Sequence, residues 1–218
     1  MNSDRSTCPH CNRKIADFGV FSANPIFDSA KNALINEYCE QHYDFRCTTC
    51  GDEVIHKCVQ FLNKERDEHT QLLQGLLQRI PVISVHNPSK WDYKVIDLVT
   101  AQSTLGTGLI TDVASVFTDL FGKQSGSYNK KLQEGEELCK AFLRAKALRI
   151  GANAILAVDV DYTDFGGAKS MVCVCMTGTA IHLNNPEIFD TDLSSNAARL
   201  KFALERLDVL NKIYPGQT

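Results

Sequence analysis

Five stretches of the chain carry apolar residues at spacings of three and four, the period of an amphipathic helix. They cover residues 27–38, 59–80, 109–121, 128–150 and 194–214. Asp28 is suited to cap the first of these helices, and Pro81 ends the second. Gly151 follows the fourth, where a left-handed residue commonly ends a helix. The pattern therefore predicts several helices with clear stop signals.

Three other stretches are rich in β-branched and apolar residues over lengths typical of strands. They cover residues 93–101, 154–162 and 170–182, and a shorter apolar run occupies residues 82–85. Gly166 and Gly167 predict a turn between the last two strands. A glycine-containing turn at Gly106 and Gly108 is expected after the first strand.

These patterns divide the chain into four predicted segments. Residues 1–58 are cysteine-rich and irregular, and residues 59–80 form a connecting helix. Residues 81–185 hold the strands and their helices, and residues 186–218 hold the final helix. The apolar stripe of that helix must be buried against the domain or against another subunit.

Composition and charge limit the classes of partner and the cellular compartment that we expect. The chain has 218 residues and a formal net charge of −3, so it has no general electrostatic attraction for nucleic acid or for an anionic membrane. No apolar run approaches the roughly 20 residues that cross a bilayer, and the polar first residues do not form a signal peptide. We therefore expect a cytoplasmic protein, in which the nine cysteines are reduced.

Two cysteine pairs carry the clearest chemical signal. Cys8 and Cys11 are separated by two residues, and so are Cys47 and Cys50. This spacing lets both sulfurs of one turn point at a common centre, and two such turns complete a tetrahedral Zn²⁺ site. Cys-Pro-His-Cys also occurs in thioredoxin-like oxidoreductases, but only seven residues precede Cys8, too few for the strand that presents such a motif. The spacing favours structural zinc in a zinc-ribbon-like module.

Other nearby residues leave the ligand set open. The stretch Glu37–Gly51 resembles the middle of a LIM-type finger, with one residue missing between His42 and Cys47. His42 could replace one cysteine as a ligand. Alternatively, a second site could use Cys39, His42, His56 and Cys58.

The second domain contains a weaker candidate site. Cys173 and Cys175 alternate along a predicted strand and share a face, as do Asp159 and Asp161. The two thiols could bind a soft metal, but two small buried residues facing the helix layer are the favoured interpretation, and the same holds for Cys139. The two carboxylates could bind a hard cation or line the pore of an assembly.

Three motifs in the second domain occur in the order found in the YbjQ-like family, a group of small bacterial proteins labelled as heavy-metal-binding. They are Gln124–Tyr128 (QSGSY), Gly151–Tyr162 (GANAILAVDVDY) and Met171–Ile181 (MVCVCMTGTAI). Over residues 93–182 the chain resembles this family. It departs from it at Asp97 and Ala101, where the family has a glycine-containing strand.

This resemblance implies an α+β fold with a dodecin-like β-α-β-β unit, in which a helix packs on one face of an antiparallel sheet. It also implies assembly into ring-shaped pentamers, or into decamers made of two rings. The cysteine module, the connecting helix and the C-terminal helix lie outside it. It supplies no catalytic residue.

Together, these observations favour a non-enzymatic, ring-forming assembly or binding protein, whose zinc modules present a surface to a protein partner. The alternative is a metal sensor or store that uses thiols. Nucleic-acid binding through the cysteine module is disfavoured, since only Arg13 and Lys14 beside the first pair argue for it.

Overall fold

The computed structural model describes residues 5–16, 23–105, 128–164 and 172–215. The chain divides into two compact units, residues 1–68 with 207–218 and residues 69–206. The boundaries between the units fall inside two helices, α2 (Thr48–Leu76) and α5 (Leu193–Ile213). Each unit is described separately below.

The first unit is built around the short helix α1 (Ser29–Tyr38) and the first part of α2. As predicted, Asp28 caps α1: its carboxylate accepts a hydrogen bond of 2.9 Å from the amide of Lys31. The core of this unit is apolar and includes the C-terminal part of α5. Its buried residues are Phe27, Leu34, Ile35, Ile55, Cys58, Leu62 and Leu210.

Helix α2 begins much earlier than the predicted connecting helix. The expected start was residue 59, but the helix runs without interruption from Thr48 to Leu76, and a 3-10 turn, η1 (Leu77–Arg79), follows it. No proline lies between Thr48 and Ile80 to stop it. The prediction placed the second cysteine pair in irregular chain because such pairs often occupy turns.

One glycine near the start of α2 permits close packing. Gly51 lies against the buried ring of Phe27, and a Cβ added at Gly51 would overlap that ring. The lost helix propensity at Gly51 is therefore offset by the approach of the aromatic side chain to the helix backbone.

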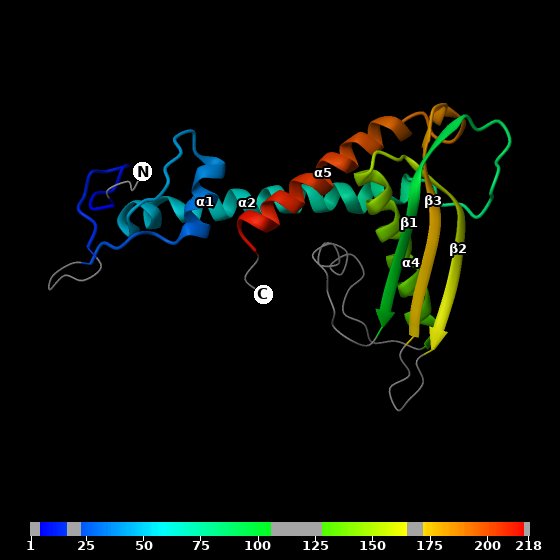
Figure 1. Cartoon of the computed structure of the whole chain (residues 1–218), viewed down its shortest axis with the longest axis horizontal. Helices are drawn as coiled ribbons and strands as arrows, with labels where there is room; N and C mark the ends of the chain where they lie inside the picture. The colour runs from blue at the N-terminus through cyan, green and yellow to red at the C-terminus, as the bar shows by residue number, and fades with distance from the viewer. Residues whose placement is uncertain (1–4, 17–22, 106–127, 165–171, 216–218) are drawn as a thin grey trace. The chain divides into compact units, whose positions relative to one another are not determined.

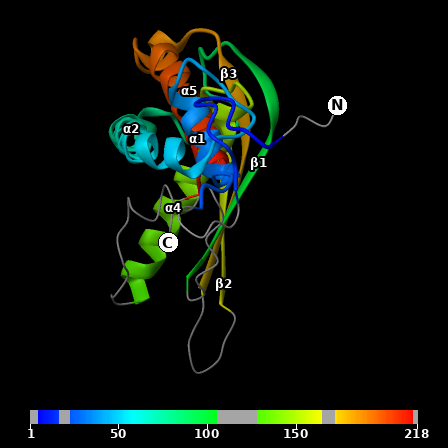
Figure 2. The same cartoon turned by 90° about the vertical axis from the view of Figure 1, so that its left-hand side faces the viewer.

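The second unit contains the β-α-β-β domain that the resemblance implied (Figures 1 and 2). Its strands are β1 (Tyr93–Leu105), β2 (Ala154–Asp164) and β3 (Val172–Leu183). They form an antiparallel sheet in the order β1-β3-β2. Helix α4 (Tyr128–Arg149) packs on one face of this sheet. The α+β fold class is thus confirmed.

The core of the second unit lies between α4 and the sheet. Cys139, Leu143 and Ala147 of α4 are buried there. The sheet contributes buried residues from all three strands: Val99, Ala101, Ile155, Val174, Met176 and Ala180. The left-handed end of α4 is also as predicted, because Gly151 has φ 86° and the Ala152 amide donates to the Ala147 carbonyl at 2.9 Å.

The apolar run at residues 82–85 lies parallel to β2. The Ile83 amide donates to the Ile155 carbonyl at 3.0 Å, and the Val158 amide donates to the Ile83 carbonyl at 3.1 Å. The register of β2 against β3 shifts between Leu156 and Asp159, and Ala157 there has φ 52°. This irregularity is a β-bulge at the edge of the sheet.

Helix α5 follows a short 3-10 turn, η2 (Pro186–Ile188), and buries the apolar stripe that its sequence predicts. The buried residues are Leu193, Leu200, Ala203, Leu204, Leu207 and Leu210. The predicted helix at 109–121 and the predicted turns at Gly106, Gly108, Gly166 and Gly167 lie outside the described residues. Among the described helices, none is long and apolar enough to span a membrane.

Candidate metal centre

The first cysteine pair lies on a tight hairpin-like turn. The Cys8 amide donates to the Arg13 carbonyl at 2.9 Å, and the Asn12 amide donates to the Cys8 carbonyl at 2.8 Å. Thr7 and Lys14 pair as a short antiparallel bridge on either side of the turn. Asn12 has φ 57°, a left-handed conformation that asparagine tolerates well. The turn therefore holds Cys8 and Cys11 on the same side.

The second pair lies where α2 begins. Cys47 immediately precedes the helix and pairs with Ile26 in an antiparallel bridge, and Cys50 lies in the first turn. The turn expected of a zinc-ribbon-like module is thus present at the first pair, whereas the second pair lies at the start of a helix. Helical backbone over Thr48–Cys50 keeps two thiols that are three positions apart on one face.

Asn24 connects the two halves of the site, and the sequence analysis did not identify it. Its side-chain oxygen accepts hydrogen bonds from the hydroxyls of Thr48 at 3.3 Å and Thr49 at 3.0 Å. Its amide nitrogen donates to the Lys14 carbonyl at 3.2 Å. The same oxygen accepts a hydrogen bond of 3.4 Å from the Thr49 amide, as an N-cap does, although Asn24 is distant in sequence from α2.

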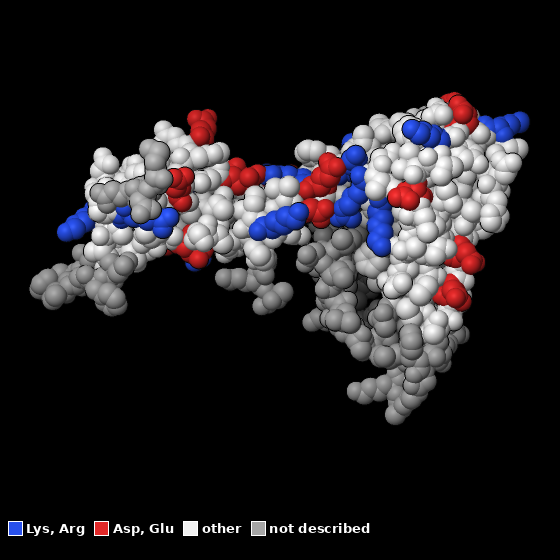
Figure 3. All heavy atoms as spheres, in the orientation of Figure 1, with Lys and Arg blue, Asp and Glu red and all other residues white. Residues whose placement is uncertain are grey.

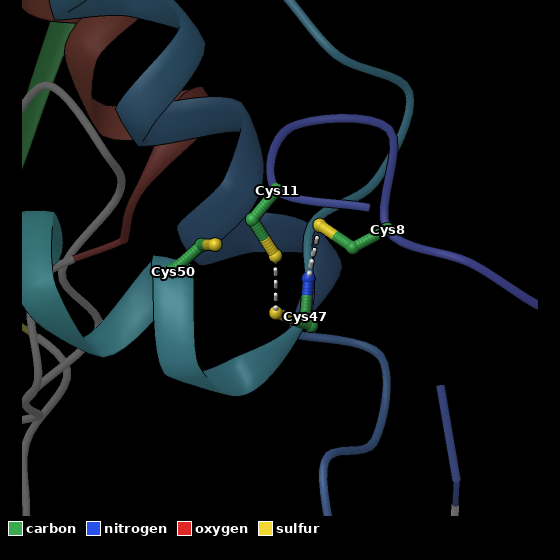
Figure 4. Close-up of side chains that lie close together, drawn as sticks. All are labelled: Cys8, Cys11, Cys47 and Cys50. Carbon is green, nitrogen blue, oxygen red and sulfur yellow. Dashed lines mark hydrogen bonds between the residues drawn. The ribbon is translucent and has the colours of Figure 1, made fainter. Parts of the chain in front are cut away.

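The four predicted cysteines meet at one point (Figure 4). The sulfurs of Cys8, Cys11, Cys47 and Cys50 all lie within 4.8 Å of one another. Cys11 and Cys47 are 3.7 Å apart between sulfurs. Zn–S bonds of about 2.3 Å in a tetrahedron place sulfurs about 3.8 Å apart. The thiols therefore fit a single tetrahedral metal ion.

Burial makes this a closed site. Cys8, Cys47 and Cys50 are buried, and only Cys11 is partly exposed. The Cys47 amide donates to the Cys8 sulfur at 3.3 Å, a contact that stabilises a thiolate. With four protein ligands gathered and little exposure, no coordination position is left open for a substrate.

The pKa values of two of the thiols also favour a bound cation at this site. Burial raises the pKa of Cys47, but hydrogen bonds involving the Cys50 amide, Asn24 and the neighbouring thiols outweigh it and lower that pKa to about 7. Burial, hydrogen bonds to Cys11 and Cys47, and the negative charge of Cys47 and Cys8 raise the pKa of Cys50. A cation bound at this point would favour the ionised form of Cys50, whose thiol is otherwise held protonated.

The alternate ligands do not join this cluster. Among the described residues, the four-cysteine group is the only set of three or more histidine, cysteine or acidic side chains close enough for one ion. Cys39 and Cys58 contact the apolar core of the first unit, and the side chains of His42 and His56 are exposed.

A buried arginine fixes the loop that carries His42. Arg46 donates hydrogen bonds of 2.6 Å to the side-chain oxygens of both Asn32 and Asn36, and one of 3.0 Å to the Gln41 carbonyl. This network occupies the inner side of the loop between α1 and Cys47. Because Arg46 is charged, nothing in the sequence indicated that its side chain would be buried.

The weaker candidate site in the second unit is arranged differently from the favoured prediction. Val174 and Met176 pack against α4, so the alternate residues Cys173 and Cys175 lie on the opposite face of the sheet. The interpretation that these two cysteines face the helix layer was therefore wrong. Cys139 does lie in the helix layer, and its thiol donates to the Val174 carbonyl at 3.2 Å.

Asp159 and Asp161 are exposed, and each lies opposite a β3 residue. Asp161 pairs in register with Cys175, and Asp159 pairs with Thr177. Burial, a hydrogen bond and charge from Cys173, and the charge of Asp161 together raise the pKa of Cys175.

Comparisons with known proteins match about half of the chain. A family model for YbjQ, described as "Putative heavy-metal-binding", matches residues 83–184. A UPF0145 protein of Carboxydothermus hydrogenoformans is 34% identical over 95 residues, which are 44% of this chain and 86% of that protein. A UPF0145 protein of Actinobacillus pleuropneumoniae serotype 5b is 35% identical over 106 residues, 49% of this chain and 96% of that protein.

A solved structure is also similar. It is the crystal structure of a protein of unknown function from Pediococcus pentosaceus ATCC 25745, assigned to the DUF74 family. It matches 47% of this chain and 96% of its own length, with 15% sequence identity and a TM-score of 0.31.

Proposed function

Because the chain belongs to the YbjQ/UPF0145 family through residues 83–184, we propose that it is a non-enzymatic assembly protein, in which this domain forms a symmetric ring and the cysteine module presents a surface for a protein partner. In this proposal Zn²⁺ holds the module together. A ring that displays several modules binds a partner multivalently, which raises the overall affinity without any new contact within one module.

The observation that carries the proposal is the role of the thiols in packing. Around the four-cysteine site, the buried cluster consists of Cys8, Cys47 and Cys50, with Cys11 and Ile15 packed against it. Among the residues that the structure describes, Ile15 is the one large apolar side chain in this cluster. A metal bound by the thiols would take the place of a hydrophobic core, as structural zinc does in small domains.

The edge of the sheet supports assembly. Strand β1 spans 13 residues, and among the described residues no strand pairs with its outer edge. Val95 is 58% exposed and Leu98 is 66% exposed on this strand. A long edge strand with exposed apolar side chains is a template for pairing with another chain.

The charge on the face drawn in Figure 3 favours a protein partner over nucleic acid. Figure 3 shows acidic and basic side chains interspersed on the face drawn, without a broad basic area. Phosphate binding draws most of its affinity from concentrated Lys and Arg side chains. An interspersed surface suits protein contacts with matched polar pairs.

Native mass spectrometry of the purified full chain tests the proposal, because it reports subunit number and bound metal together. We expect a closed oligomer that carries one zinc ion per chain. A monomer at micromolar concentration would contradict the ring, and an oligomer without metal would contradict the zinc module.

A pair of variants separates the two parts of the proposal. The double substitution Cys8→Ser and Cys47→Ser should abolish zinc binding but leave the oligomer intact, since the family domain does not contain these residues. Cys39→Ser is the matched control, because Cys39 is a partly exposed thiol outside the four-cysteine site and should leave both zinc and assembly unchanged.

A further inference from the structure

A second pair of thiols lies in the middle of β3, away from the four-cysteine site. The sulfurs of Cys173 and Cys175 are 3.6 Å apart. This is close to the separation of about 3.8 Å between two sulfurs on one tetrahedral zinc-like ion. The strand holds both side chains on one face of the sheet, so the two thiols are already oriented as a chelate.

The third thiol of this unit does not belong to the pair. Cys139 is buried on α4, on the other side of the sheet, and its thiol is engaged by the Val174 carbonyl. Figure 2 shows α4 along one side of the three strands. Among the described residues, the pair is therefore the one two-thiol group on the sheet face opposite α4.

The surroundings of the pair admit a cation. Cys173 is 8% exposed, while Cys175 is partly exposed and gives access from the sheet surface. The residues opposite Cys175 in register are Asp161 on β2 and Gln102 on β1, and both are exposed. The carboxylate of Asp161 adds negative charge on this face, and this charge helps to raise the pKa of Cys175, but the carboxylate does not join the two thiols as a third ligand.

A disulfide between these cysteines is the competing outcome, and strand geometry works against it. Residues two positions apart in a strand have Cα atoms about 6.6 Å apart. Disulfides usually need a Cα separation of about 4.4–6.8 Å, so this spacing is at the upper end of the range. A metal bridge of two Zn–S-type bonds requires only a few tenths of an ångström of movement from the observed sulfur positions.

We propose that Cys173 and Cys175 form a second, open metal site that chelates a thiophilic divalent ion of the Zn²⁺ or Cd²⁺ class on the sheet face opposite α4. This inference goes beyond the proposed assembly function and does not depend on it. Both thiols lose their protons to solvent as the two metal–sulfur bonds form, and no electrons are transferred. Water completes the coordination, in contrast to the closed four-cysteine site.

Cadmium is a suitable probe because it binds thiolates and its charge-transfer absorbance counts them. The full-length protein, kept reduced, is saturated with Cd²⁺ and desalted, and the ions per chain are counted by native mass spectrometry. We expect two ions in the unmodified chain and one in Cys175→Ser. Cys139→Ala is the matched control, since it removes a thiol from the same unit but should keep two ions.

A second substitution guards against misfolding. Cys175→Val keeps the side chain compatible with a strand, and it should also bind one ion, with circular dichroism unchanged. One ion in the unmodified chain, or two ions in both Cys175 variants, would overturn the inference.

The same measurement separates this site from the zinc module. Cys8→Ser should lose the ion at the four-cysteine site and keep the ion at Cys173 and Cys175. Failure of the module would therefore appear as an unchanged ion count in Cys8→Ser, and failure of the present inference as an unchanged ion count in Cys175→Ser.

Discussion

Gly51 shows how one missing side chain determines the packing of the first unit. Its backbone contacts the ring of Phe27, and any added side-chain carbon would overlap that ring. We expect Gly51→Ala to lower the free energy of unfolding by roughly 1–3 kcal/mol, since overpacking of a core costs about this much. Thermal or urea unfolding measures the change.

Gly75 is the matched control on the same helix. No atom lies within 4 Å of a Cβ added there. Gly75→Ala should therefore be neutral, or should stabilise the protein by up to about 1 kcal/mol through helix propensity. Equal effects of the two substitutions would contradict the packing argument.

Because of the Cys139 thiol, we expect the free energy of unfolding to depend on pH in the alkaline range. Its pKa is raised to about 12, first by burial and then by the charges of Cys175 and Cys173. An unfolded thiol ionises near pH 8.5, so above that pH the folded state binds more protons than the unfolded state, and stability falls as pH rises toward 12.

The expected size of this effect follows from linkage. Between about pH 9 and pH 11, the free energy of unfolding of the unmodified chain should fall about 1 kcal/mol per pH unit more steeply than that of Cys139→Ala. Urea unfolding at several pH values measures both slopes. Below about pH 8 the two slopes should be the same, and identical slopes at high pH would contradict the burial of the thiol.

At the scale of elements, the start of α2 lies at the cysteine site, and we expect it to depend on a metal bound there. Cys47 immediately precedes the first turn and Cys50 lies in it, and Asn24 caps this turn from another segment. Removing the metal leaves thiols that repel one another when they ionise. Chelation should therefore increase hydrogen exchange over residues 47–51, while the amides of β3 and α4 remain protected.

Hydrogen exchange with mass spectrometry, before and after chelation, tests this expectation. The Cys8→Ser and Cys47→Ser double variant should already show the faster exchange without a chelator. Equal protection of residues 47–51 in all samples would mean that the helix start is independent of the metal.

The sequence predicted some elements better than others, for physical reasons. Helix α4 combines a long apolar face with a glycine at its end, and its bounds agree within one residue of the prediction. The start of α2 was missed because Thr48–Cys50 has no helical apolar pattern, and its cap comes from Asn24. Tertiary contacts determine such helix boundaries, and these contacts cannot be recognised in the local sequence pattern.

The face of β3 could not be predicted for a related reason. Val174 and Met176 alternate with Cys173 and Cys175, and all four are apolar or weakly polar. An alternation of period two identifies a buried face only when the other face is polar. In contrast, the spacing of the four N-terminal cysteines specified their meeting point directly, because few geometries besides a shared centre use that pattern.

At the scale of the whole molecule, the main prediction concerns assembly of several chains. Leu98 is exposed on β1, so a charge there is tolerated in a single chain but not inside a contact between chains. We expect Leu98→Lys to weaken the proposed oligomer by about tenfold or more, as removal of a buried apolar anchor does. Light scattering over a dilution series measures the change.

Phe202 provides the control for this experiment. It is 61% exposed on α5, outside the matched family domain. Phe202→Lys should leave the mass of the oligomer unchanged. An unchanged mass in Leu98→Lys would show that the contact between chains uses another surface.

The first unit is built from two distant parts of the chain, and this affects the order in which it can fold during synthesis. Leu210 completes a core with Phe27 and Leu34, and Arg66 donates to the carbonyl of Leu210. During synthesis the four cysteines leave the ribosome about 160 residues before Leu210, so metal can be captured while the neighbouring core is still unfinished. A nascent chain is thus expected to hold its ion first and to expose Phe27, Leu34 and Leu62 to chaperones until translation reaches α5.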